Sequence, residues 1–183
     1  MNRVGFRALA LIVVLMLGAC GRAQQTSVST AGGEWHEFDG TWIAAGTRQV
    51  IRLGGDRQAS VAKYSGSLVL TGPARPAAGF RADAVVFDDT KTGGVGRAVW
   101  TDEHGDTVYS ELREEILPAG SKIVGTIFGG TGRYAGATGT YEFSWRFLVE
   151  TDDGNVQGQS TGLKGRIRVI SSSASTRSGG SRS

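Results

Sequence analysis

Cysteine, histidine and proline are scarce in this chain of 183 residues, which contains one Cys, two His and three Pro. A single Cys excludes an internal disulfide framework and a zinc site built from several cysteines, and two His leave little scope for a Cys/His metal site. The 29 Gly follow no G-X-Y period, which excludes a collagen-like chain. With 39% hydrophobic residues the chain is not wholly disordered, and its length suits one domain.

The apolar run near the N-terminus is too short to span a membrane. It covers residues 8–17, ten residues, whereas a spanning helix needs roughly 20. Two Arg precede this run and the small residues Gly18 and Ala19 follow it, which is the order of charged, apolar and cleavage regions in a signal peptide. We therefore expect residues 1–19 to be a signal peptide.

The end of this segment resembles the lipobox of bacterial lipoproteins. The matching residues are Leu17-Gly18-Ala19-Cys20, and Cys20 is the single Cys of the chain. The resemblance implies a lipoprotein whose Cys20 carries acyl chains such as palmitate, with the lipid bilayer as its partner. Gly rather than Asp at position 21 implies, by resemblance to enterobacterial sorting, an outer-membrane protein of the cell envelope that faces the periplasm.

Basic residues are not concentrated in the part of the chain expected to fold. Five of the 20 basic residues and none of the 17 acidic ones lie outside residues 34–170, so the formal charge falls from +3 for the chain to −2 for that part. No basic patch remains, and we exclude nucleic acid as a partner.

Polar residues 20–33 are expected to form the lipidated Cys and a flexible tether. Ser-rich residues 171–183 are expected to form a disordered tail.

Residues 34–170 show the period-two alternation of β-strands. The clearest case is TYEFSWRFLVE, residues 140–150, where alternate positions from Tyr141 to Val149 are apolar, and hairpins are expected around His104-Gly105 and Asp153-Gly154. Other strands are expected over 42–45, 49–53, 60–70, 81–88, 122–128 and 163–169. About eight strands without crossover helices exclude a parallel sheet and leave an antiparallel sandwich or a closed barrel.

The segment 125–141, GTIFGGTGRYAGATGTY, is rich in glycine. Its Gly spacing does not match a dinucleotide-binding fingerprint, and it lacks the Lys-Ser/Thr pair of a phosphate-binding loop. From the residues alone, we interpret it as a tight connection in which glycines allow positive φ and close approach of backbones.

The part of this segment that reads GGTGRYAGATG also resembles the signature of dirigent proteins and allene oxide cyclase-like barrels. The resemblance implies an all-β fold, a single eight-stranded antiparallel β-barrel of the allene oxide cyclase-like type, over residues 34–170. Proteins of this family stabilise reactive intermediates in an apolar barrel cavity, so the resemblance also implies a cavity that needs no cofactor.

Two groups of residues are candidates for a site. Phe143, Trp145 and Phe147 share one strand face and either fill the core or line a ligand cavity. The segment WTDEHGDTVYSE, residues 100–111, adds Trp100 and Tyr109 as ligand-binding candidates and Glu111 as a catalytic one. A Glu inside an apolar barrel has a raised pKa and can act as a general acid, with a nearby Tyr donating to an oxyanion. The other acids of the segment are more simply a solvated turn, and no metal site is expected.

Three functions stay open at this point. The barrel either binds a small hydrophobic molecule, or acts as a cofactor-free cyclase or isomerase on an apolar substrate, or is a packed structural or interaction lipoprotein. The volume and polarity of the interior separate them. A filled core favours the third function, an all-apolar cavity the first, and a cavity with buried acids beside aromatic residues the second.

Overall fold

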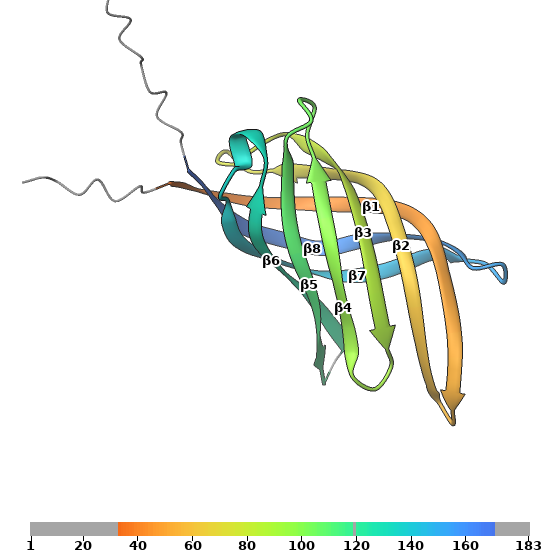
Figure 1. Cartoon of the computed structure of the whole chain (residues 1–183). Coiled ribbons are helices and arrows are strands. Elements are labelled where there is room, and N and C mark those ends of the chain that lie inside the picture. The colour runs from red at the N-terminus through yellow and green to blue at the C-terminus, as the bar shows by residue number, and fades with distance from the viewer. Residues whose placement is uncertain (1–32, 119, 171–183) are drawn as a thin grey trace, which may run out of the picture. The chain divides into compact units, whose positions relative to one another are not determined.

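Eight antiparallel strands close into a barrel in the computed structural model, which describes residues 33–118 and 120–170 (Figure 1). Each strand pairs with the next one in sequence, and β8 closes the barrel by pairing with β1. The elements are β1 (Glu34–Gly54), β2 (Arg57–Thr71), β3 (Gly79–Asp89), β4 (Gly93–Thr101), β5 (Thr107–Leu117), β6 (Gly120–Gly130), the short 3-10 helix η1 (Gly132–Tyr134), β7 (Thr138–Glu150) and β8 (Asn155–Val169). The predicted fold class, an eight-stranded antiparallel β-barrel, is confirmed.

The two short strands expected over 42–45 and 49–53 form one long strand, β1. Gly46 lies between them and stays in register with Tyr64 of β2 and Val156 of β8. A Cβ at position 46 would collide with the backbone of Lys63, so this glycine allows β2 to pass close to β1. The hairpins expected around His104-Gly105 and Asp153-Gly154 are confirmed, with Gly105 and Gly154 at φ of 85° and 84°.

The barrel interior is filled with aromatic side chains over much of its length. Trp100 contacts Phe38, Phe80 and Tyr141, with ring centroids 6.0, 5.7 and 4.7 Å away. The hydroxyl groups of Tyr141 and Ser110 share a buried hydrogen bond of 2.7 Å. These residues come from different strands and meet because alternate positions of every strand turn inward.

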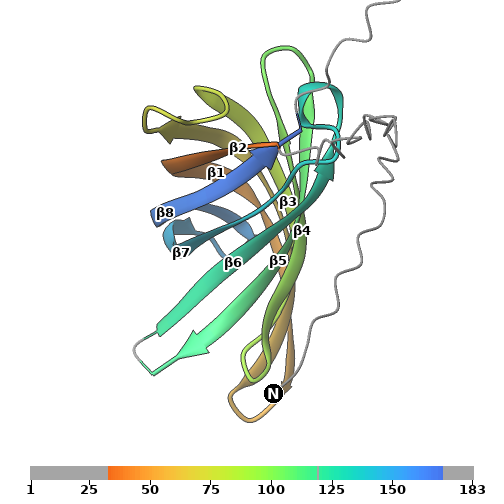
Figure 2. The same ribbon diagram turned by 90° about the vertical axis from the view of Figure 1, so that its left-hand side faces the viewer.

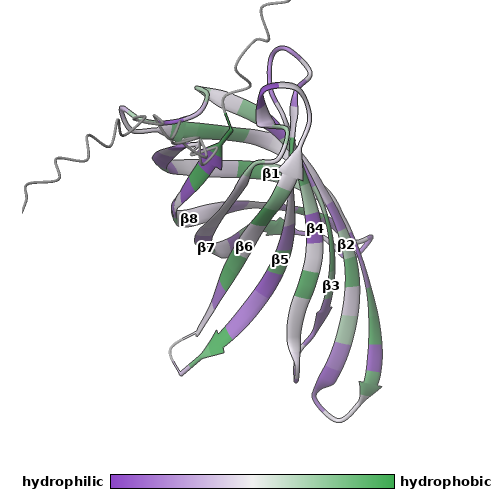
Figure 3. Cartoon of the chain, turned by 60° about the vertical axis from the view of Figure 1, so that its left-hand side comes forward, coloured by the Kyte–Doolittle hydropathy of each residue, from purple (hydrophilic) through white to green (hydrophobic). Residues whose placement is uncertain are grey.

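Hydrophobic and hydrophilic residues are interspersed along the strands (Figure 3), and apolar residues are among those that the outer face exposes. Val61, Phe87 and Val95 are paired across β2, β3 and β4, and each is about half exposed. Their neighbours along the strands include charged residues such as Lys63 and Arg97. The outer face is therefore mixed, whereas the inner face is mainly apolar.

The glycine-rich motif closes one end of the barrel. Its η1 turn inserts Tyr134, which is fully buried with its ring centroid 5.7 Å from that of Phe80. Arg133 Nε donates to Asp102 Oδ2 at 2.8 Å, and Asp102 Oδ1 accepts the backbone N–H groups of His104 and Asp106 at 2.8 and 3.0 Å. The acids of the 102–106 turn thus include a buried structural carboxylate, not only solvated groups.

The two ends of the barrel differ. The η1 turn, the β4–β5 hairpin and the paired outer ends of β1 and β8 lie at the closed end, where Glu34 pairs with Val169. The hairpins β1–β2, β3–β4 and β5–β6 extend at the other end (Figures 1 and 2). The chain therefore enters and leaves the barrel at the end that the motif closes.

Replacing Gly132 or Gly136 with Val is expected to lower the free energy of unfolding by about 1–3 kcal/mol. The interpretation of the motif as a tight turn is confirmed, since these glycines have φ of 51° and 70°, and a Cβ at position 132 would also collide with the Asp106 carboxylate. Gly129→Val is the matched control, because position 129 lacks a positive φ and has open space around it. Urea unfolding of the three variants measures the difference, and equal losses in all three would contradict the strain argument.

Candidate functional site

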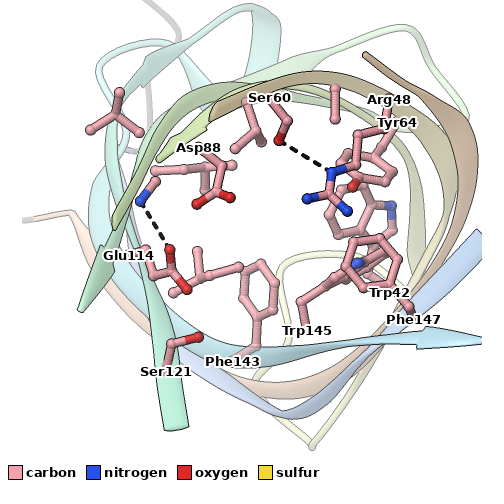
Figure 4. Close-up of a pocket in the computed structure, with 16 residues that line it drawn as sticks. Trp42, Arg48, Ser60, Tyr64, Asp88, Glu114, Ser121, Phe143, Trp145 and Phe147 are labelled. Atoms are coloured by element: carbon pink, nitrogen blue, oxygen red, sulfur yellow. Dashed lines mark hydrogen bonds between the residues drawn. The ribbon is translucent and has the colours of Figure 1, made fainter. Parts of the chain in front are cut away.

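A cavity of about 200 Å³ lies inside the barrel at the end away from the motif (Figure 4). Side chains from seven strands, β1 to β7, line it because alternate residues of each strand turn inward. An apolar cavity of about 150 Å³ is enough to hold benzene, so this one has room for a compact ligand of one or two rings. The barrel is therefore not completely packed.

Aromatic side chains form one wall of the cavity. Trp42 comes from β1, Tyr64 from β2, and Phe143, Trp145 and Phe147 from alternate positions of β7. The ring centroid of Trp145 lies 5.0 Å from that of Trp42 and 5.2 Å from that of Tyr64. Rings at these separations attract one another and present a continuous apolar surface to a ligand.

Arg48 reaches the cavity from β1, next to the aromatic wall, and neighbouring groups hold it there. Its Nε donates to Ser60 Oγ at 3.2 Å, and its Nη1 donates to Glu150 Oε1 at 2.8 Å. The guanidinium carbon lies 5.6 Å from the centroid of the Phe147 ring. The positive charge of Arg48 is thus already matched by the carboxylate of Glu150.

Two carboxyl groups lie across the cavity from Arg48 (Figure 4). Asp88 is near the end of β3 and Glu114 belongs to β5, with Gly94 of β4 between them. Glu114 Oε2 accepts the Gly94 N–H at 2.9 Å. Asp88 Oδ1 and Glu114 Oε2 each lie 3.4 Å from the position that a Cβ on residue 94 would take. The two carboxyl groups therefore converge beside Gly94.

The surroundings of Asp88 affect its ionisation. Burial raises the pKa of Asp88, and the Glu114 carboxyl raises it further by charge and hydrogen bonding, while Arg48 lowers it by a smaller amount. Within the described residues, no ion pair is formed by Asp88 or Glu114. Two neighbouring carboxyl groups without a cation favour either a shared proton or a bound positive charge.

Two buried indole donors in the aromatic wall lack an acceptor. Nε1 of Trp42 and Nε1 of Trp145 have no hydrogen-bond partner among the residues that the structure describes. A buried donor left unpaired costs about 1–3 kcal/mol. Buried donors of this kind call for an explanation, and a binding site is one.

Three of the five predicted ligand-binding residues, Phe143, Trp145 and Phe147, line the cavity. Trp100 is buried deeper in the barrel, beside a void of about 10 Å³, which leaves no room for a ligand. Tyr109 lies on the outer face of β5, with its ring centroid 6.2 Å from that of the exposed Phe128. The structure does not bring Trp100 and Tyr109 to the cavity.

The catalytic candidate Glu111 also points away from the cavity. Its side chain is 56% exposed and forms an ion pair of 2.9 Å with Arg97, the residue opposite it on β4. The inward positions of β5 are Val108, Ser110, Leu112 and Glu114. Glu111 has the opposite phase because successive side chains of a strand point to opposite faces.

Sequence analysis missed Trp42 and Tyr64 of the aromatic wall and the charged residues of the cavity, Arg48, Asp88 and Glu114. A signal for two of them was present in the alternation. Apolar Val108 and Leu112 fix the inward phase of β5 and place Glu114 inside, and Ala84 and Val86 place Asp88 inside in the same way. Arg48 faces inward by the same alternation, counted from Trp42 and Ala44. This count requires that residues 42–48 belong to one strand, as they do in β1.

The features described so far define an all-β antiparallel barrel with a partly aromatic, partly acidic cavity. Within residues 33–118 and 120–170, no three His, Cys, Asp or Glu side chains are grouped so as to hold a metal ion. No family model matches the chain, and no curated protein matches it. Among solved structures, a pterocarpan synthase dirigent protein is similar, with 13% identity over 75% of this chain and 94% of that chain and a TM-score of 0.42.

Proposed function

We propose that this chain is a lipid-anchored protein of the bacterial cell envelope whose barrel binds one small, mainly hydrophobic molecule. The observation that carries the binding proposal is the cavity of about 200 Å³ walled by Trp42, Tyr64, Phe143, Trp145 and Phe147. A structural lipoprotein with a packed barrel has no need of this space, because an empty cavity lowers stability by about 24 cal/mol for each Å³.

The anchoring proposal rests on Leu17-Gly18-Ala19-Cys20, which lies outside the described residues. In the part of the chain that the structure describes, no helix is long and apolar enough to cross a membrane. Acyl chains on Cys20 supply the attachment to a bilayer in this proposal, and several chains on one Cys give stable anchoring. The ligand is then held in the envelope at a membrane surface.

The size of the cavity sets the kind of ligand. Pockets for drug-sized ligands have volumes of about 300–1,000 Å³, and this cavity is smaller. Compact aromatic compounds of about a dozen non-hydrogen atoms gain roughly 0.3–0.5 kcal/mol per atom on binding, which corresponds to dissociation constants from tens of micromolar to about 2 mM.

Naphthylmethanol, a neutral bicyclic probe, is expected to bind the full chain with an affinity in this range, as measured by calorimetric titration. Ala62 lines the cavity, and Ala62→Phe is expected to weaken binding at least tenfold because the new ring occupies the space. Val61→Phe is the matched control, since it adds the same ring one residue away on the exposed outer face. Thermal unfolding of both variants verifies that they are folded. Absence of binding to the wild-type chain, or an equal effect of the two variants, would refute the proposal.

A second candidate function is acid catalysis, as in a cofactor-free cyclase or isomerase. The observation that favours it is the raised pKa of Asp88, caused by burial and by Glu114, inside a cavity that also holds Tyr64. A carboxyl group with a raised pKa keeps its proton to a higher pH than an ordinary Asp and can protonate a bound substrate. Once a converted compound is known, Asp88→Asn should lower turnover by about 10²–10⁴-fold, whereas Glu111→Gln should not.

A further inference from the structure

The charged groups of the cavity do not balance. Two carboxyl groups, Asp88 and Glu114, and one cation, Arg48, line it, and Arg48 is already paired with Glu150, which lies outside the lining. Arg48 is held by Ser60 and Glu150 on the aromatic side, and its closest ion pair is the 2.8 Å contact with Glu150. The two converging acids across the cavity therefore have no cation of their own in the described part of the chain.

The surroundings of the two acids are suited to a cation that enters with a ligand. Gly94 leaves the acid pair without a side chain between its members, since Asp88 Oδ1 and Glu114 Oε2 approach the same point to within 3.4 Å. A Lys or Arg in that space would neutralise the pair, but the position carries only hydrogen. Burial raises the pKa of Asp88, and the neighbouring Glu114 carboxyl raises it further.

The opposite wall supplies the contact for the rest of such a ligand. The aromatic rings of Phe143, Trp145 and Trp42 offer apolar faces, and aromatic faces also attract a cationic group. A carboxylate pair at one side and aromatic faces at the other match a molecule with a protonated amine on a compact ring system. An anionic ligand would meet an acid pair that has no cation of its own, and a neutral one would leave that pair without a partner.

We propose that the cavity selects a cationic amine carried on a small apolar ring system, with the ammonium group between Asp88 and Glu114 and the rings against the aromatic wall. This inference rests on the proposed binding function and adds the charge of the ligand to it. It assigns Asp88 and Glu114 as the residues that determine specificity.

Three probes with similar rings and different charge test the inference on the full chain: naphthylmethylamine, naphthylmethanol and naphthoate. At neutral pH the amine is expected to bind at least tenfold more tightly than the alcohol, and naphthoate more weakly than both. In Asp88→Asn/Glu114→Gln the amine and the alcohol should bind with about equal affinity. The affinity for the alcohol itself should change less than threefold. Gln at position 114 retains an acceptor for the Gly94 N–H, which protects the fold.

Glu111→Gln is the matched control, because it removes a carboxylate of the same strand that faces outward. It should keep the full preference for the amine. Should the double variant not fold, Asp88→Asn alone must reduce the preference. Equal binding of the amine and the alcohol by the wild-type chain, or a preference that survives in the acid variants, overturns the inference and leaves the proposed function standing. Failure of all three probes to bind overturns both.

Discussion

Replacing Asp102 with Ala is expected to lower the free energy of unfolding by about 3 kcal/mol, a typical cost of breaking a buried ion pair. The Asp102 side chain is fully buried and accepts from Arg133 Nε and from the backbone N–H groups of His104 and Asp106. The substitution leaves these donors without an acceptor at the end of the barrel where Tyr134 is inserted. Glu103→Ala is the control, because Glu103 is exposed and its removal should change stability by less than about 0.5 kcal/mol. Equal losses in urea unfolding would contradict this role for Asp102.

The same carboxylate gives the barrel a specific dependence on pH. Burial by itself raises the pKa of Asp102, but the hydrogen bonds from His104, Arg133 and Asp106 together outweigh burial and lower the pKa below its ordinary value. A carboxyl group with a lowered pKa in the folded state contributes stability above its unfolded pKa of about 4, and this contribution is lost as the pH falls through its folded pKa. The difference between wild type and Asp102→Ala should therefore be constant above about pH 5 and should shrink below about pH 4.

The fold was predictable from the sequence because its two main signals are local. Alternation in residues such as Tyr141, Phe143 and Trp145 predicts strands, and the glycines at the turns predict where the strands reverse. The exception is β1, which was expected as two strands on either side of Gly46. A glycine inside a strand can allow a neighbouring strand to pass close by. The sequence alone does not distinguish such a glycine from one in a turn.

The site was only partly predictable, and the choice of Glu111 shows why. Its selection followed from its position within a strand, but a strand has two faces, and burial depends on phase. The apolar residues Val108 and Leu112 set that phase and place Glu114 inside. The sequence could not predict that Glu114 lies next to Asp88. Their proximity depends on the register of β3, β4 and β5 around Gly94, and only the closed barrel specifies this register.

Cys20→Ser is expected to abolish incorporation of labelled palmitate and to move the protein from the membrane fraction to the soluble fraction. The reason is that acyl chains on Cys20 are the proposed attachment to the bilayer, and without them the exported chain has only its polar tether. Cys20→Ser/Ser173→Cys is the control for position, because it keeps one Cys in the chain but places it outside the lipobox. Label in either variant would contradict lipidation at Cys20.

The same variant separates anchoring from binding. The barrel begins at Glu34, which pairs with Val169 at the end closed by η1, whereas the cavity lies at the other end. Because the tether joins the barrel away from the cavity, the loss of the acyl chains should leave the affinity for naphthylmethanol within twofold of the wild-type value. A large change in affinity in Cys20→Ser would mean that the acyl chains themselves, or the membrane they enter, occupy or complete the cavity.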